Sequence, residues 1–159
     1  MCVIVIDNQF VTRRSIMYES AHLMYGGGVV DSLNPYGGFI MPYVDGFVLP
    51  VPKKKLQAYR SMARKAGKIW REHGALEYRE CVADDVKPGK LTSFPQSVKL
   101  KPGETVVFSW IVYQSKVERN RINAKVMKDP RLAKMMDPKA MPFDANRMIY
   151  GGLKVLVDF

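Results

Sequence analysis

The sequence predicts an α+β fold in which four strands form one antiparallel sheet and two helices cover one face of it. The chain of 159 residues is long enough for one domain with its own core and too short for two ordinary domains. Strand and helix patterns follow one another in the order strand, helix, strand, strand, helix, strand. Residues 106–113 contain no charged residue, and both the even-numbered and the odd-numbered positions are largely apolar. This pattern is typical of a strand that is buried on both faces of a sheet.

The first strand is expected over residues 43–51, where both parities are apolar and Asp45 is the exception. A carboxylate in such a strand must be hydrogen-bonded, lie at an exposed end or be functional. Pro52 suits the first position of the helix that follows. This helix spans about 20 residues and ends at Gly74, a left-handed cap. Its apolar stripe consists of Leu56, Tyr59, Ala63, Ala66, Trp70 and His73.

Lys53, Lys54 and Lys55 stand at the start of this helix, where the helix dipole disfavours cations. They either form a solvated face or compensate by holding an anion. The second strand, over residues 76–83, carries Glu77, Arg79 and Glu80 and is therefore expected at an edge of the sheet. Residues 84–101 have loop composition, with a short extended piece expected over 97–100.

The third strand ends where Ser115 and Glu118 form an S-x-x-E capping box, which starts the second helix. Asp129 and Pro130 then indicate a cap and a first-turn proline of a short helix that reaches about Met136. The last strand is expected over residues 148–158, as a second edge strand. Its inward-facing residues are expected to be Ile149, Leu153, Val155 and Val157, while Lys154 and Asp158 mark the wetter side.

This order of elements is the split βαβ arrangement of ferredoxin-like folds, in which the first and third strands are central and the other two are edges. The two strands that are apolar on both faces are the first and the third, as this arrangement requires. Two helices cover only one face of the sheet. We therefore expect a second copy of the chain to cover the other face, sheet against sheet.

Residues 1–40 differ from the rest of the chain, because they show no sustained period, contain the run Gly26 to Gly28 and carry a net charge of −1. They are interpreted as an appendage to a domain over residues 41–159, which carries +11. One hypothesis is that Met41 is the biological start and that the preceding residues are translated leader, since Gly37 and Gly38 are compatible with a ribosome-binding site in the gene. The alternative is a genuine disordered or strand-swapping extension.

Several classes of protein are disfavoured by the composition. No run of 18 apolar residues is present, so no transmembrane helix is expected, and the apolar start is cut by Asp7 without a preceding basic residue, which makes the cytoplasm the expected location. Cys2 and Cys81 form no C-x-x-C pair, and His22 and His73 are far apart in the sequence. Neither a metal site nor a cofactor is therefore expected.

Several segments of the chain resemble one bacterial protein family. These are YVDGFVLPVP, KLTSFP, VVFSWIVYQSKVERN, KVMKDPR and MPFDANRMIYGG. They look like the small YbaA-like family, a domain of unknown function in the dimeric α+β barrel superfamily, and the match covers about residues 41–159. The resemblance implies a homodimer of ferredoxin-like protomers, which together form a dimeric α+β barrel, and it implies no activity.

A pocket in such a protomer is expected between the helices and the sheet. Its candidate ligand-binding residues are Trp110, Tyr113, Asp144, Arg147 and Tyr150, and its candidate catalytic residues are His73, Tyr113 and Arg147. Structural alternatives stay open for most of them. His73 suits a helix end, Trp110 suits the core or a dimer contact, and Asp144 with Arg147 suits an ion pair that pins a loop.

Three classes of function follow from these observations. The first is a cytoplasmic homodimer that binds a small organic molecule. The second is a cofactor-free enzyme, of oxygenase or isomerase type, that acts on a small aromatic or carbonyl substrate. The third, nucleic-acid binding, is disfavoured because the basic residues are spread from Lys53 to Lys154 and no aromatic RNP-type motif is present.

Overall fold

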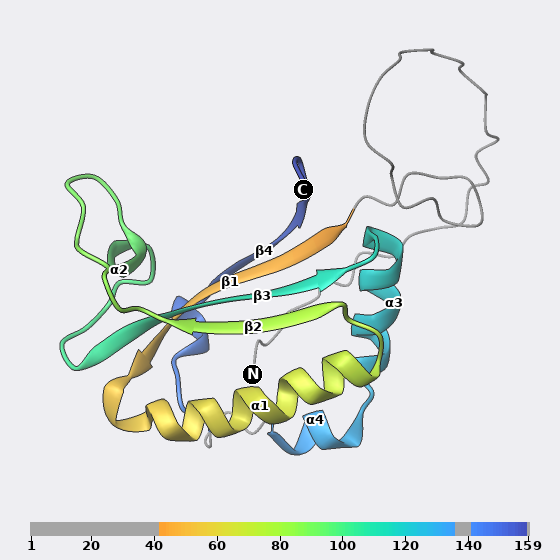
Figure 1. Ribbon diagram of the computed structural model, residues 1–159. Helices are drawn as coiled ribbons and strands as arrows, with labels where there is room; N and C mark the ends of the chain where they lie inside the picture. The colour runs from red at the N-terminus through yellow and green to blue at the C-terminus, as the bar shows by residue number, and fades with distance from the viewer. Residues whose placement is uncertain (1–41, 136–140, 159) are drawn as a thin grey trace, which may run out of the picture. The chain divides into compact units, whose positions relative to one another are not determined.

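A four-stranded antiparallel sheet with helices against one face forms the fold in the computed structural model, which describes residues 42–135 and 141–158 (Figure 1). The strands are β1 (Tyr43–Pro52), β2 (Glu77–Val82), β3 (Glu104–Tyr113) and β4 (Ile149–Lys154), in the order β2-β3-β1-β4. The central strands are β1 and β3, as the sequence predicts. The expectations for residues 1–40, including a start at Met41, lie outside the described residues.

The helices follow the strands in the ferredoxin-like order. The 3₁₀-helix η1 (Lys53–Lys55) and α1 (Leu56–Glu72) connect β1 to β2, and α3 (Lys116–Val126) follows β3. The short helices are α2 (Phe94–Ser97), α4 (Pro130–Met135) and η2 (Ala145–Arg147). In Figure 1, α1, α3 and α4 lie on one side of the sheet and α2 lies on the other side. Within the described residues, no helix combines the length and the apolarity that crossing a membrane requires.

The core lies between the sheet and α1. Odd-numbered residues of β1 and β3 face the helices, since Leu49 pairs with Val107 and both are at most 2% exposed. From α1, the buried residues are Tyr59, Ala63, Ala66, Gly67, Ile69 and Trp70, which include four of the six residues of the predicted stripe, while Leu56 and His73 are only partly buried. Burial of this stripe is the main force that holds α1 on the sheet, at about 25 cal/mol for each Å² of apolar surface removed from water.

The helix ends confirm most of the predicted caps. Gly74 has φ of +112°, the left-handed region expected of a C-terminal cap. Ser115 Oγ accepts a hydrogen bond from the Glu118 backbone N–H at 3.2 Å, but the Glu118 carboxylate pairs with Arg121. Only half of the predicted capping box is therefore made, because an arginine one turn away offers the carboxylate a charged partner.

Two local predictions are wrong. The extended piece expected over residues 97–100 is absent, and α2 ends there instead, because Ser93 caps it and Pro95 occupies its first turn. The last strand ends at Lys154, which pairs with Tyr43, the first residue of β1, so the residues beyond it have little of β1 left to pair with.

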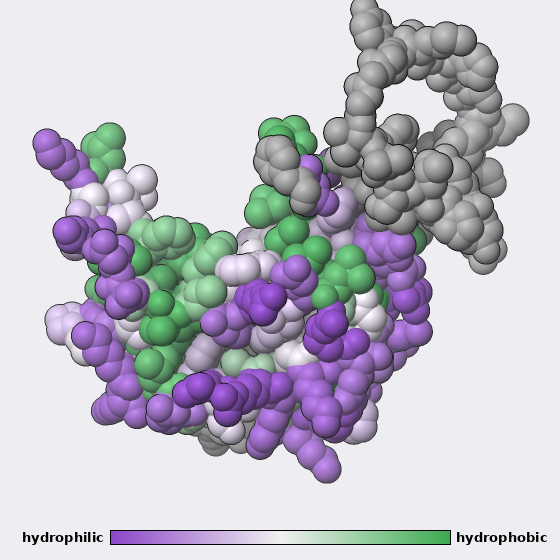
Figure 2. All heavy atoms as spheres, viewed as in Figure 1, coloured by the Kyte–Doolittle hydropathy of each residue, from purple (hydrophilic) through white to green (hydrophobic). Residues whose placement is uncertain are grey.

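The orientation predicted for β4 is also wrong, because Ile149 and Leu153 lie on the sheet face opposite the long helices and are 46% and 59% exposed. We call this side the open face. It comprises Val44, Val48, Phe108, Trp110, Val112, Ile149 and Leu153. Phe94 of α2 packs against Phe108 at one end of it, with ring centroids 6.0 Å apart. Hydrophobic residues gather above the sheet in Figure 2, between the α2 segment and the chain after β4.

Candidate functional site

A cleft of about 600 Å³ opens between α1 and the edge strand β2. This volume is within the range of small-molecule sites, which is roughly 300–1,000 Å³. Its lining is mostly apolar and includes Leu56, Ala63, Val82 and Val107. The cleft lies between a helix and the sheet, which is where the sequence places a pocket, but its lining residues differ from those predicted.

The Glu80 carboxyl group is the polar centre of the cleft. Tyr59 Oη donates to Glu80 Oε2 and Tyr78 Oη donates to Oε1, each at 2.7 Å. Burial raises the pKa of Glu80 above its ordinary value, and the hydrogen bonds from the two phenols oppose that rise. Because desolvation outweighs these hydrogen bonds, the carboxyl group exchanges a proton nearer to neutral pH than a surface glutamate does.

Strand and helix geometry bring these groups together. Tyr78 and Glu80 occupy the parity of β2 that faces the helices, since they pair with the inward-facing Ile111 and Ser109 of β3. Tyr59 comes from the first turn of α1 and is 5% exposed. Gly67 allows the Tyr78 ring to lie against α1, because a Cβ atom at Gly67 would lie 2.6 Å from Tyr78 Cδ1.

Cations line the outer side of the cleft. Arg60, Arg64 and Arg71 of α1 all contribute to its lining and are exposed. Arg71 donates to the backbone carbonyl of Ala75 at 2.7 Å. Neither Arg60 nor Arg64 has an ion pair with any residue in the described part of the chain. The cleft therefore combines an apolar wall, a carboxyl group and guanidinium groups that are available to an anion.

A second buried polar cluster lies on the other half of the helix-covered face, around Asp45. Arg119 Nε donates to both carboxylate oxygens of Asp45 at 2.9 Å, and Asn123 Nδ2 donates to Oδ2 at 3.2 Å. Asn123 Oδ1 accepts from Trp70 Nε1 and from Tyr113 Oη, both at 3.0 Å. In the described residues, every buried side-chain polar atom has a partner. Asp45 is hydrogen-bonded, the first of the options that the sequence left open.

Tyr113, a predicted site residue, belongs to this cluster and is fully buried. Its pKa is raised, first by burial and then by the nearby charge of Asp45, so the phenol stays protonated and can donate a hydrogen bond. Tyr113 does not line the cleft. Its role as a ligand-binding or catalytic residue stays a prediction.

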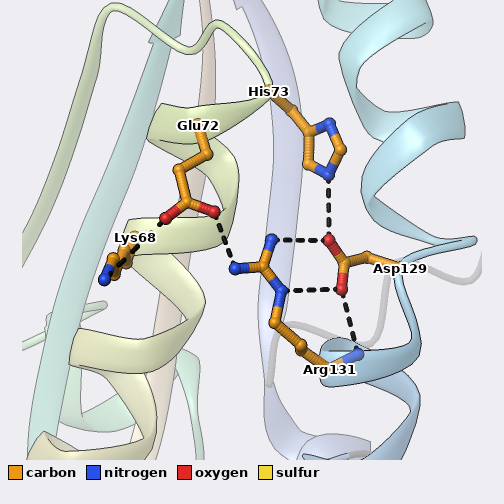
Figure 3. Close-up of polar contacts among 5 residues, drawn as sticks. All are labelled: Lys68, Glu72, His73, Asp129 and Arg131. Carbon is orange, nitrogen blue, oxygen red and sulfur yellow. Dashed lines mark hydrogen bonds and ion pairs between the residues drawn. The ribbon is translucent and has the colours of Figure 1, made fainter.

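His73 lies just beyond the end of α1 and pairs with Asp129 (Figure 3). The distance from His73 Nε2 to Asp129 Oδ2 is 3.0 Å, and Arg131 Nη2 donates to the same oxygen at 2.8 Å. Arg131 also reaches Glu72 at 2.7 Å, so the cluster connects the end of α1 with the start of α4. The pKa of Asp129 is lowered, first by the hydrogen bond from Arg131 and then by that from His73.

Arg147 and Asp144, both predicted site residues, form an ion pair at 2.8 Å. Arg147 also donates to both carboxylate oxygens of Glu104, at 2.7 and 2.6 Å, and its side chain is 13% exposed. Two carboxylates neutralise this guanidinium, and the contacts join η2 to the start of β3. This geometry favours the loop-pinning alternative, and a role in ligand binding stays a prediction.

Trp110 and Tyr150 lie on opposite faces of the sheet. Trp110 is on the open face beside Phe108, with ring centroids 5.4 Å apart. Tyr150 is on β4, and its ring stacks near Phe47 at 6.3 Å. The structure brings Asp144 and Arg147 together, but it places His73, Tyr113 and Trp110 at separate positions, and none of the six predicted residues lines the cleft.

The residues that form the cleft were not predicted as site residues from the sequence, although one signal was present. Glu80 occupies the parity of β2 that also holds Tyr78 and Val82, so a single acidic residue interrupts the apolar face of an edge strand. Among the described residues, no cluster of three or more His, Cys, Asp or Glu side chains has the geometry of a metal site.

Comparisons with known proteins identify relatives without an assigned activity. A family model described as protein of unknown function (DUF1428) matches residues 42–145. The uncharacterized protein YbaA of Escherichia coli strain K12 is 51% identical over 118 residues, which are 74% of this chain and 99% of the relative. The uncharacterized protein YbaA of Shigella flexneri matches to the same extent.

Two solved structures cover the same part of the chain. A dimeric ferredoxin-like protein from an uncultured marine organism has a TM-score of 0.47 at 10% identity, and the de novo designed protein Foldit4 has a TM-score of 0.36 at 12% identity. Each match covers 74% of this chain and 99% of the other chain.

Proposed function

The chain belongs to the DUF1428 family of proteins of unknown function, and from this starting point we propose that it is a homodimer that binds a small organic anion in the cleft between α1 and β2. The observation that carries this proposal is the combination of an apolar cleft with the Glu80 carboxyl group and the two arginines Arg60 and Arg64. A ligand with an aromatic or aliphatic body and a carboxylate matches all three features.

The chemistry of the cleft supports an anionic ligand that also carries a hydroxyl or carbonyl group. The carboxylate would pair with Arg60 and Arg64, which gain a partner that residues 42–135 and 141–158 do not supply. The hydroxyl would donate to Glu80, whose oxygens each accept one phenol hydrogen bond and have further acceptor capacity. The apolar body would lie against Ala63 and Val107.

The homodimer is supported by the apolar character of the open face. Phe108, Ile149 and Leu153 are 39%, 46% and 59% exposed, although a monomeric protein rarely leaves a contiguous apolar patch of this kind on a sheet. A second copy laid sheet against sheet would bury these residues and Trp110. The helices α1, α3 and α4 stay on the outside in this arrangement, so the cleft does not share its α1 wall with the dimer contact.

Isothermal titration calorimetry with phenylpyruvate tests the ligand proposal, with the uncharged phenylacetamide as comparison. Wild type is expected to bind the anion, and Arg60→Gln combined with Arg64→Gln is expected to weaken binding by about 10- to 100-fold, which is the effect of losing charge-assisted hydrogen bonds. Arg79→Gln is the matched control, because Arg79 is on β2 but faces the opposite side. Equal weakening by the control, or tighter binding of the amide, would contradict the proposal.

A second candidate function is proton transfer in the same cleft, as in a cofactor-free isomerase. It is favoured by the raised pKa of Glu80, because such a carboxyl group accepts a proton from one substrate atom and returns it to another without any oxidant or metal. Conversion of enol to keto phenylpyruvate, followed by ultraviolet absorbance, tests this. Glu80→Gln is expected to abolish the conversion while keeping binding, and an unchanged rate would exclude this role of Glu80.

A further inference from the structure

The charge of the protein is concentrated on one element. Residues 53–72, which form η1 and α1, contain eight basic residues against the single carboxylate of Glu72, a net charge of +7 in a chain whose total is +10. All eight side chains are exposed, and we call them the basic ridge. Its members are Lys53, Lys54, Lys55, Arg60, Arg64, Lys65, Lys68 and Arg71. Hydrophilic residues dominate the lower side of the molecule in Figure 2, where Figure 1 places α1.

Little in the described chain neutralises this ridge. Lys68 pairs with Glu72 at 3.9 Å, and Arg71 reaches a backbone carbonyl, whereas the other six cations have no ion pair with a described residue. Arg60, Arg64 and Lys68 follow one another at i, i+4 spacing, where like charges destabilise a helix by roughly 0.2–0.5 kcal/mol for each pair. Lys53 to Lys55 add cations at the end of the helix where the dipole disfavours them. A polyanionic partner would remove these penalties.

A second row of cations continues the ridge on α4. A groove of about 500 Å³ between α1 and α4 is lined by Lys65, Lys68, Ile69, Arg131, Lys134 and Met135, of which four are basic. Arg131 is held in place by Glu72 at 2.7 Å and by Asp129 at 2.8 Å (Figure 3). Its guanidinium is therefore fixed at the groove, while the ammonium groups of Lys65 and Lys134 have no ion pair with a described residue and are available to another molecule.

The chemistry of the ridge identifies the kind of partner. α1 is about 26 Å long at 1.5 Å per residue, and cations one turn apart repeat at about 5.4 Å. A nucleic-acid strand carries one phosphate per roughly 3.4 Å of helix axis, so its charges lie at a spacing of the same order. An anionic membrane fits less well, because the apolar face of α1 is buried in the core, where Ile69 and Trp70 are at most 3% exposed. The helix therefore has no exposed apolar face that could insert into lipid.

We propose that the basic ridge, together with the α4 groove, binds the phosphate backbone of nucleic acid without regard to sequence. The described part of α1 presents no exposed aromatic ring for stacking on bases, so contacts to phosphate dominate. The spread of basic residues along the sequence disfavoured such a partner. The structure weighs against that objection, since the basic residues of 53–72 are all exposed on η1 and α1, and Arg131 and Lys134 of α4 lie beside them. The ridge lies opposite the open face, so a dimer formed there leaves it accessible.

The test compares two triple variants of the full chain that remove the same charge from different places. The groove variant is Lys65→Gln, Lys68→Gln and Lys134→Gln, and none of these residues lines the α1–β2 cleft. The control variant is Lys87→Gln, Lys90→Gln and Lys101→Gln, all exposed in the chain between β2 and β3. Circular dichroism verifies that both variants fold, and phenylpyruvate binding is measured in parallel, so that failure of the ridge and failure of the cleft are separate results.

Binding is measured by fluorescence anisotropy with a labelled 20-nucleotide single-stranded RNA and with a duplex DNA of the same length, between 50 and 200 mM salt. Wild type is expected to bind at 50 mM salt with a micromolar dissociation constant, and log K is expected to fall linearly with log salt. The groove variant is expected to lose at least tenfold in affinity at 50 mM salt. Its salt slope for single strands is expected to be about 2 smaller, which is roughly 0.7 for each of three phosphate contacts.

Three results would overturn the proposal. Equal weakening by the groove and control variants would show that net charge alone, without a defined surface, holds the nucleic acid. Absence of binding by wild type at 50 mM salt would remove the partner. Tight binding to vesicles that contain phosphatidylserine, with weak binding to both nucleic acids, would assign the ridge to a membrane surface instead.

Discussion

Replacing Arg119 with methionine tests whether the buried cluster around Asp45 is a structural element of the fold. Methionine keeps much of the apolar stem of arginine and removes the guanidinium that contacts both oxygens of Asp45 at 2.9 Å. Because Asp45 is 2% exposed, the variant leaves a buried carboxylate that keeps the bond from Asn123, at 3.2 Å, but loses its ion pair. Loss of one partner of a buried pair costs about 3–5 kcal/mol.

The structure lowers this estimate somewhat. Arg119 itself is 23% exposed, so water can reach the edge of the cluster, and Asn123 continues to donate. We expect a loss of about 2–4 kcal/mol, a large fraction of the roughly 5–15 kcal/mol that stabilises a domain. Urea unfolding at one fixed protein concentration measures it as a shift of the midpoint at unchanged slope.

Two further variants make this reasoning refutable. Asp45→Asn in the Arg119→Met background removes the unpaired charge and is expected to recover at least half of the loss. Arg121→Met is the matched control on the same helix, because Arg121 pairs with Glu118 at the surface, and it is expected to leave the midpoint nearly unchanged. A loss below about 1 kcal/mol for Arg119→Met, or a double variant as unstable as the single one, would show that Asp45 does not depend on its ion pair.

Three other predictions follow from the ionisable groups and the open face. The hydrogen bonds from Arg147 lower the pKa of Glu104 from 4.5 to about 2, so the stabilisation that they give is complete above pH 4.5 and is lost as the pH falls toward 2. After solvent screening, this contribution to the free energy of unfolding is about 1–2 kcal/mol. Glu104→Gln should remove this acid sensitivity, measured as the difference between urea midpoints at pH 3 and pH 6. Burial raises the pKa of Glu80, so wild type should lose stability as the pH rises from 4.5 through that raised value, whereas Glu80→Gln should show no such loss in the same assay. Trp110→Asp places a charge in the centre of the open face and should convert a homodimer into a folded monomer, measured by light scattering after size-exclusion chromatography; a dimer that persists would exclude this face as the contact.

The secondary structure was largely predictable because it depends on local patterns. In β1 and β3 the odd-numbered and the even-numbered positions are both largely apolar, which indicated central strands. Ser115 and Gly74 marked helix ends, because a capping hydrogen bond and a left-handed φ depend only on a few neighbouring residues. The errors occur where the length of a strand and the faces of its residues depend on the neighbouring strand with which it pairs. β4 is shorter than its apolar pattern because its neighbour β1 has its first paired residue at Tyr43, and Ile149 and Leu153 lie on the open face because the register pairs them with Val48 and Val44.

The candidate site was less predictable, because it depends on contacts between residues far apart in the chain. Arg147 was attractive as an anion holder, but Glu104, 43 residues earlier, neutralises it. Glu80 suggested a wet edge strand, although the packing of Tyr59 and Tyr78 around its carboxyl group makes it the centre of a cleft. The environment of a side chain, more than its type, decides which of these groups remains available for chemistry.

By itself the sequence determined the order of the elements, the two central strands and the excess of positive charge, since periodicity, caps and composition are properties of neighbouring residues. Only the tertiary structure decided which charges stay without a partner. It paired Asp45 with Arg119 across 74 residues and placed Arg60 and Arg64 beside an apolar cleft. Coulomb and desolvation energies depend on distance in space and on burial, and neither quantity is fixed until the chain has folded.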